Sequence, residues 1–167
     1  AAPFTATMLS DFGAEVITLE RPKVKGDTAR HQKPQIVNPE NGNHISGAWL
    51  QNSRNKLSVT LETNLNKLPE SKEIFLSLIK QVDVWIEHMV WIEKLGITDG
   101  ILLEVNPVLI ICHGSEFGTP KFGCEENYLN RACYDPLAQA ESGWCLLQGF
   151  PDKPPYYAQQ YIGDYLS

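Results

Sequence analysis

Residues 82–113 read VDVWIEHMVWIEKLGITDGILLEVNPVLIICH, and this stretch decides the fold. It opens with Val82–Glu87, whose β-branched and apolar side chains are typical of a strand. Short helical segments are expected at Ile92–Leu95 and Asp99–Val105. The almost wholly apolar run Val108–His113 then predicts a strand covered on both faces. A strand, a helical connection and another strand together predict two parallel strands joined by a right-handed crossover.

The same alternation of strands and helices continues on both sides of this stretch. Strands are expected at Glu15–Glu20 and Leu57–Glu62, and helices at Ala1–Phe12, from Pro69 onward and at Asp135–Leu147. The polar segment from Lys23 to Asn43 shows no apolar period and is expected to be a long surface connection. We therefore expect an α/β fold, a Rossmann-like parallel sheet with flanking helices, in one domain that takes in residues 1–167.

The overall composition is that of an ordinary globular protein. The 167 residues are 43% hydrophobic and 20% charged, and the formal net charge of −6 argues against broad binding of nucleic acid. No apolar run approaches the length that spans a bilayer, and the first residues do not resemble a signal peptide. The four cysteines are widely spaced, which favours free thiols. We expect a soluble, cytoplasmic protein with no membrane partner.

Several common kinds of site lack support in the sequence. The four histidines lie in separate segments without the spacing of metal ligands, so no metal site is expected. Neither GxGxxG nor GxxxxGK[ST] occurs, which removes the sequence support for dinucleotide oxidoreductases and P-loop NTPases. Cys112 and His113 would point to opposite faces of a strand, so they cannot act as a nucleophile and base pair, and core packing is expected for both.

Two basic groups could receive the phosphates of a nucleotide-like ligand. The loop after the first expected strand sets six basic residues against the single acid Asp27, and Arg54-Asn55-Lys56 forms a second group. From charge alone, solvated loops are the more common explanation for such groups. The basic residues of the loop are Arg21, Lys23, Lys25, Arg30, His31 and Lys33.

Asp164 follows Gly163 where a helix is expected to open. The backbone N–H groups and dipole of a helix start favour an ionised carboxylate there, although an ordinary acidic residue of a first helical turn would look the same.

The order and spacing of many short blocks resemble the class III CoA-transferases, including the formyl-CoA, carnitine and 2-hydroxyacid types. The resemblance covers essentially the whole chain. Its blocks include Phe12-Gly13-Ala14-Glu15-Val16-Ile17, Leu19-Glu20-Arg21-Pro22, Gly26-Asp27-Thr28-Ala29-Arg30, Arg54-Asn55-Lys56-Leu57, Asp83-Val84-Trp85-Ile86-Glu87, Tyr134-Asp135-Pro136-Leu137-Ala138-Gln139-Ala140 and Gly163-Asp164-Tyr165.

The resemblance implies roles for particular residues. Asp164 matches the catalytic aspartate, which exchanges coenzyme A between carboxylic acids through an aspartyl-CoA thioester. Arg21 matches a residue that contacts the CoA nucleotide, Ala2 lies in a segment that lines the CoA site, and His88 stands where some members place an Asn near CoA. In the two basic groups, Arg30 and Lys56 are further candidates for CoA binding. No permanently bound cofactor is required, because coenzyme A and acyl-CoA are substrates.

Two other functions stay open at this point. An α-methylacyl-CoA racemase shares the expected fold, but it places a His at the position of Tyr134, and tyrosine is a poor acid or base near neutral pH. The chain could also be a non-catalytic member of the family. By resemblance, a first strand should precede Ala1 and more than half of the protein should follow Ser167, so the chain is expected to be the N-terminal part of the large CoA-binding domain and inactive alone. The complete protein is expected to form an interlocked homodimer.

Overall fold

The computed structural model describes residues 1–24, 26–89, 91–115, 117–129 and 131–166, and the chain forms two compact units. The larger unit consists of Pro3–Trp85 and Ile92–Ile111. The smaller unit consists of Ala1–Ala2, Ile86–Trp91 and Cys112–Ser167.

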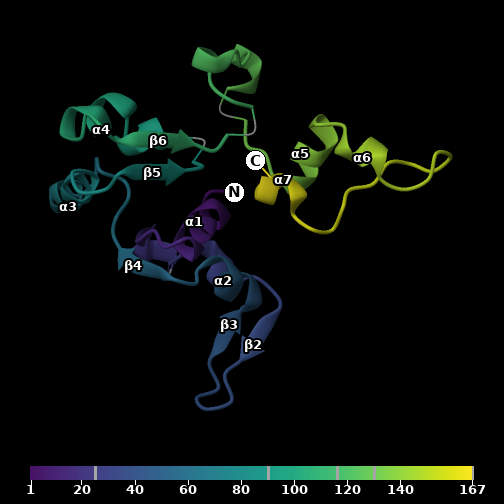
Figure 1. The fold of residues 1–167 in the computed structure, drawn as a ribbon, viewed down its shortest axis with the longest axis horizontal. Helices are drawn as coiled ribbons and strands as arrows, with labels where there is room; N and C mark the ends of the chain where they lie inside the picture. The colour runs from purple at the N-terminus through teal and green to yellow at the C-terminus, as the bar shows by residue number, and fades with distance from the viewer. Residues whose placement is uncertain (25, 90, 116, 130, 167) are drawn as a thin grey trace. The chain divides into compact units, whose positions relative to one another are not determined.

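A parallel strand pair organises the first half of the larger unit. Helix α1 (Ala2–Asp11) leads into β1 (Val16–Glu20), which pairs in parallel with β4 (Lys56–Thr60) (Figure 1). The register places Val16 opposite Lys56 and Glu20 opposite Thr60. Because the strands are parallel, their carboxyl ends lie at the same edge, where ligands of open α/β sheets commonly bind.

The connection between β1 and β4 is more ordered than its composition predicts. Its middle forms an antiparallel hairpin, β2 (Gln35–Val37) and β3 (His44–Ser46), which extends from α2 (Gly47–Asn52) in Figure 1. Ser46 caps α2 by accepting a hydrogen bond from the Trp49 N–H at 3.3 Å. The segment was expected to be a long surface connection, and the hairpin within it was not predicted, because three-residue strands are too short to show an alternating pattern.

The second half of the larger unit is a helix and strand layer around one apolar core. Its elements are α3 (Pro69–Ile79), the first half of β5 (Val84–Glu87), the 3₁₀ turn Ile92–Leu95, α4 (Asp99–Val105) and the first half of β6 (Ile110–His113). The Ile110 N–H donates to the Asp83 carbonyl at 2.9 Å, and the Gly114 N–H donates to the Glu87 carbonyl at 2.7 Å. The constant offset between donor and acceptor shows that β5 and β6 run parallel.

The core is built by the apolar faces of α3 and α4. Phe75, Ile79 and Leu102 are almost fully buried, and the ring of Phe75 meets that of Trp85 edge to face at 5.3 Å between centroids. On β6, by contrast, Ile110 is 62% exposed, so the strand is not covered on both faces in this chain. Cys112 is also exposed, which contradicts the core position expected from the sequence.

The smaller unit is mainly helices and turns. It contains α5 (Asp135–Glu141), α6 (Trp144–Leu147), α7 (Ile162–Leu166) and 3₁₀ turns at Pro120–Phe122 and Glu126–Tyr128. The sequence predicted a single helix over Asp135–Leu147, but Gly143, at φ +77°, divides it. A left-handed residue cannot continue a right-handed helix, and glycine adopts this conformation without a side-chain clash.

The expected fold class, α/β with parallel strands and flanking helices, is confirmed. In the part of the chain that the structure describes, the strands form three two-stranded sheets, β1–β4, β2–β3 and β5–β6. No helix among these described residues is both long and apolar enough to cross a bilayer.

We predict that Phe75→Ala lowers the free energy of unfolding by about 3–5 kcal/mol, because it opens a cavity beneath α3. Phe12→Ala is the matched control, since Phe12 is 87% exposed, and it should change the free energy by less than about 0.5 kcal/mol. Urea unfolding followed by tryptophan fluorescence measures both changes. Equal effects at the two positions would contradict this description of the core.

Candidate functional site

A buried carboxylate lies at the carboxyl edge of the β1–β4 pair. Glu20, the last residue of β1, is only 3% exposed. Its Oε2 accepts hydrogen bonds from Arg30 Nε and the Asp27 N–H, both at 2.7 Å. Its Oε1 accepts from Arg30 Nη2 at 2.7 Å and from Ser58 Oγ at 2.6 Å. The side chain therefore ties the following loop to both strands.

The ion pair between Glu20 and Arg30 controls the electrostatics at the carboxyl edge of the β1–β4 pair. The two hydrogen bonds from Arg30 are the main reason that the pKa of Glu20 falls to about 2, and the same contacts raise the pKa of Arg30. The Arg30 guanidinium also stacks over the Trp49 ring, with 3.8 Å between the central carbon and the ring centroid. Arg30, expected from the sequence to contact CoA, is thus held in place by contacts within the chain.

An open pocket of about 240 Å³ lies beside this ion pair. Gly26 reaches the pocket at φ +96°, and a Cβ there would lie 2.3 Å from Glu20 Oε2, so only glycine fits this approach. Arg21 is exposed and lies between two residues of the pocket wall in the sequence. The pocket is lined by Glu20, Pro22, Gly26, Arg30, Ser58 and Thr60. Lys25 of the basic loop lies outside the described residues.

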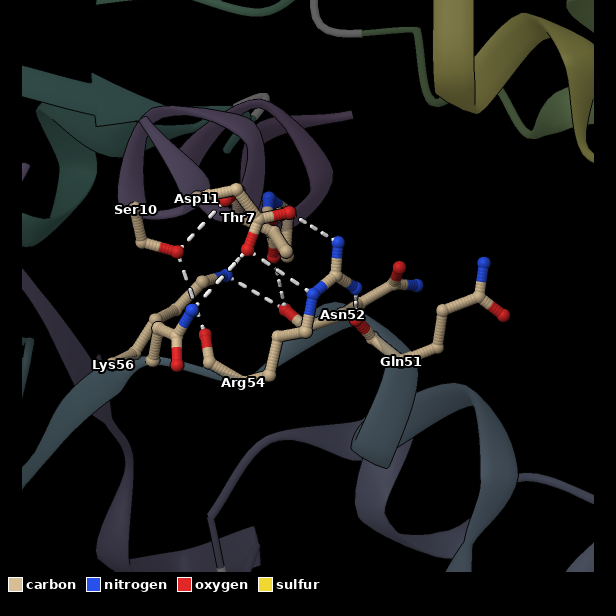
Figure 2. Close-up of polar contacts among 9 residues, drawn as sticks. Thr7, Ser10, Asp11, Gln51, Asn52, Arg54 and Lys56 are labelled. Carbon is tan, nitrogen blue, oxygen red and sulfur yellow. Dashed lines mark hydrogen bonds and ion pairs between the residues drawn. The ribbon is translucent and has the colours of Figure 1, made fainter. Parts of the chain in front are cut away.

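Lys56, another candidate for CoA binding, contributes to a polar network that joins α1 to the residues after α2 (Figure 2). Its ammonium donates to the carbonyls of Pro3 at 2.5 Å and Asn52 at 2.7 Å. Burial lowers the pKa of Lys56 to about 8. Next to it, the Arg54 guanidinium pairs with the Asp11 carboxylate. Figure 2 shows the side chains of Lys56, Arg54 and Asp11 converging between α1 and the start of β4.

In the smaller unit, the segment before Asp164 is fastened to α5. The Asp135 carboxylate is only 4% exposed, and its Oδ1 accepts the Gly163 N–H at 2.7 Å. A Cβ at Gly163 would lie 3.0 Å from the Ala138 Cβ and 3.2 Å from Asp135 Oδ1, so α5 and α7 approach closely at this glycine. Asp164 follows immediately, with its side chain 44% exposed. The backbone beneath this carboxylate is fixed, while the carboxylate itself faces solvent.

Ala1 and Ala2 belong to the same unit as Asp164. Asp164 Oδ1 lies 3.9 Å from the backbone nitrogen of Ala1. The segment that resemblance assigns to the CoA site and the candidate nucleophile are therefore brought together. Arg21, Arg30 and Lys56 belong to the larger unit.

A second buried carboxylate is the last residue of β5. Glu87 is 6% exposed, its Oε1 lies 2.5 Å from His113 Nδ1, and its Oε2 accepts the Met89 N–H at 2.5 Å. The contact holds the start of the loop that carries His88, an exposed side chain. His113 was expected in the core, but its side chain is 30% exposed and paired with Glu87. Glu20, Glu87 and Asp135 were not predicted from the sequence to be buried anchors.

Metal ligands do not gather anywhere in the described ranges. Among these residues, no group of three or more His, Cys, Asp or Glu side chains could hold a metal ion.

Comparison with protein families identifies one match over the whole chain. CoA-transferase family III matches residues 1–167. The chain is 39% identical to the bile acid CoA-transferase BaiK of Clostridium scindens, over 100% of this chain and 34% of that protein. It is 35% identical to the formyl-CoA:oxalate CoA-transferase of Escherichia coli, over 98% of this chain and 36% of that protein. The chain thus spans about a third of the length of these relatives.

Solved structures agree with this match. A CaiB/BaiF family protein from Brucella suis superposes with a TM-score of 0.81 at 29% identity, covering 96% of this chain and 40% of that one. The Mycobacterium tuberculosis protein Rv3272 gives a TM-score of 0.76 at 29% identity, covering 96% of this chain and 42% of that one.

The Glu20 ion pair predicts a pH dependence of stability. Because the pKa of Glu20 falls from 4.5 to about 2 on folding, its stabilising contribution is complete above pH 4.5 and is lost as the pH falls from 4.5 to 2. Glu20→Gln should therefore cost up to about 3 kcal/mol at neutral pH and progressively less in acid. Urea unfolding at a series of pH values measures the difference. Glu73→Gln, on an exposed face of α3, is the control. If the difference in unfolding free energy between Glu20→Gln and the unaltered protein does not change with pH, the low pKa of Glu20 is contradicted.

Proposed function

The chain belongs to CoA-transferase family III, and on that premise we propose that it forms part of an enzyme that transfers coenzyme A between carboxylic acids, with Asp164 as the nucleophile. The observation that carries the proposal is that the Asp164 carboxylate is exposed while the backbone before it is fixed. Its carboxylate is 44% exposed, while the preceding N–H is held by the buried Asp135. An accessible carboxylate on a fixed backbone suits nucleophilic catalysis.

The first half of the reaction activates the aspartate. A carboxylate oxygen of Asp164 attacks the thioester carbon of the donor acyl-CoA, the C–S bond breaks, and CoA leaves as a thiolate. The product is a mixed anhydride between Asp164 and the donor acyl group. The thiolate then attacks the Asp164 carbonyl carbon, and the donor acid departs as a carboxylate. Asp164 is left as an aspartyl-CoA thioester.

The second half reverses these steps with the acceptor acid. The acceptor carboxylate attacks the aspartyl thioester, releases the thiolate and forms a new mixed anhydride. The thiolate attacks the acceptor carbonyl carbon, so the acceptor leaves as an acyl-CoA and Asp164 returns to a carboxylate. The exchange conserves the energy of the thioester, provided that water is excluded from both intermediates.

CoA-binding residues are proposed within each unit by itself. In the larger unit, Arg21, exposed beside the pocket at the β1–β4 edge, would contact the nucleotide. Arg30, paired with Glu20 in the wall of that pocket, and Lys56, at the opposite end of the strand pair, are the further candidates there. In the smaller unit, Ala2, next to the residue that approaches Asp164, and His88, on the loop fixed by Glu87, are proposed to contact CoA. Guanidinium groups suit phosphates because they can donate two parallel hydrogen bonds.

The proposed substrates are an acyl-CoA and a carboxylic acid, and no permanently bound cofactor is included. The racemase alternative is not favoured, since the relatives reported above are named CoA-transferases, and Tyr134 stands where a racemase would need its histidine. The chain would be the N-terminal part of the CoA-binding domain of an interlocked homodimer in the cytoplasm.

We expect Asp164→Asn to abolish CoA exchange in the full-length protein. With an acyl-CoA donor, hydroxylamine should trap the anhydride or thioester and leave a hydroxamate at Asp164, which peptide mass spectrometry would locate. Asp152→Asn, an exposed carboxylate in the same unit, is the matched control and should retain activity. An adduct on Asp135, or substantial exchange by Asp164→Ala, would show that the nucleophile is misassigned.

Arg21→Ala should weaken CoA binding by about 1.5–3 kcal/mol, the range for a lost charge-assisted hydrogen bond. Isothermal titration of the full-length protein with CoA measures the loss. Lys72→Ala removes one positive charge from an exposed face of α3 and should leave the affinity within about 0.5 kcal/mol. If Arg21→Ala binds CoA as tightly as this control does, Arg21 does not contact the nucleotide.

A further inference from the structure

Gln139 is a buried amide whose hydrogen bonds are directed at the segment before Asp164. It lies on α5 and is 1% exposed. Its Oε1 accepts the Ala158 N–H at 2.7 Å, and its Nε2 donates to the Ala158 carbonyl at 3.1 Å. The side-chain amide thus pairs with both backbone groups of one residue, as a neighbouring strand would. Its Nε2 also donates to Asp135 Oδ2 at 2.7 Å.

Gln139 and Asp135 together fix both ends of the segment Ala158–Gly163. They are four residues apart on α5, so both side chains lie on the same face of the helix. Gln139 holds Ala158, and the other Asp135 oxygen holds the Gly163 N–H. Asp164 is the next residue. A shift at Gly163 would move the backbone of Asp164 directly, and a shift at Ala158 would reach it through the rest of the segment.

We propose that Gln139 is a positioning residue for the Asp164 carboxylate, acting through Ala158 and, by way of Asp135, through Gly163. The inference rests on the proposed function, because it assumes that Asp164 reacts. It adds a residue that does not touch the substrate but controls the reaction rate. Its prediction is specific: loss of Gln139 should impair the chemical steps more than it impairs CoA binding.

The chemical identity of this side chain is required by its partners. The Asp135 oxygen and the Ala158 carbonyl both need donors, whereas the Ala158 N–H needs an acceptor. A carboxamide of this length supplies both kinds of group. An ionised carboxylate would place an acceptor oxygen, in the position of Nε2, against both the Asp135 oxygen and the Ala158 carbonyl, which is unfavourable in a buried site.

The first experiment separates positioning from binding. In the full-length enzyme, Gln139→Ala should lower kcat about 10- to 100-fold, as expected when a reacting group is displaced by about 1 Å, with KM for acyl-CoA changed less than about twofold. The yield of hydroxamate at Asp164 should fall in parallel. Gln159→Ala, an exposed glutamine in the segment that Gln139 holds, is the control and should leave kcat unchanged.

The second experiment uses a variant whose hydrogen bonds can be restored by protonation. In Gln139→Glu, the neutral carboxyl group can accept from Ala158 and donate to Asp135, whereas the ionised form cannot donate. Burial and the facing Asp135 carboxylate should raise the pKa of this carboxyl group. Ala158 faces it with backbone groups, and Asp164 and Tyr165 are the titratable side chains described on α7. Relative to the unaltered enzyme, kcat should recover reversibly as the pH falls.

Each outcome of these experiments supports or overturns the inference. A normal kcat in a folded Gln139→Ala enzyme, or an increase in KM alone, would overturn it while leaving Asp164 as the nucleophile. A pH-independent kcat ratio for Gln139→Glu would also overturn it. If both variants fail to fold, Gln139 is a residue of the core and not a positioning residue. Activity in Asp164→Ala would instead show that the proposed function itself is wrong.

Discussion

A carboxylate that is removed from water must receive hydrogen bonds, and this constraint organises both units of the chain. Glu20, Glu87 and Asp135 are each less than 7% exposed. Each accepts one backbone N–H from a later segment and at least one side-chain donor. The side-chain donors Arg30, His113 and Gln139 differ in charge, yet the result is the same. In every case a loop that leads toward a candidate functional residue is fastened to a strand or helix.

The local pattern of the sequence was sufficient to predict the helices and strands that build the core. The apolar period of α3 follows from side chains that face one shared interior, against which Trp85 of β5 and Ile111 of β6 also pack. The hairpin β2–β3 and the break at Gly143 were not predicted. Three-residue strands carry too little periodicity, and a glycine within a helical pattern does not show whether its backbone is left-handed.

The candidate site was predicted only where a family resemblance supplied it. Asp164 and Arg21 were assigned by their matching blocks, whereas the buried acids that support them were overlooked. The reason is distance along the chain. Glu87 meets a histidine 26 residues away, and Asp135 meets Gly163 28 residues away. A pairing of this kind depends on tertiary packing, and a charged residue in a strand or first helical turn otherwise resembles any solvated one.

The carboxylate of Asp164 is exposed, whereas the backbone before it is held by the hydrogen bond from the Gly163 N–H to Asp135. This contact does not restrain the two side-chain torsions of Asp164. In the proposed mechanism, the carboxyl group of Asp164 would carry first an anhydride and then a bulky thioester. Because the fixed part is the main chain, these adducts can be reached by choosing another rotamer, without moving the helix. The site thereby combines a fixed main chain with a side chain that can change its rotamer.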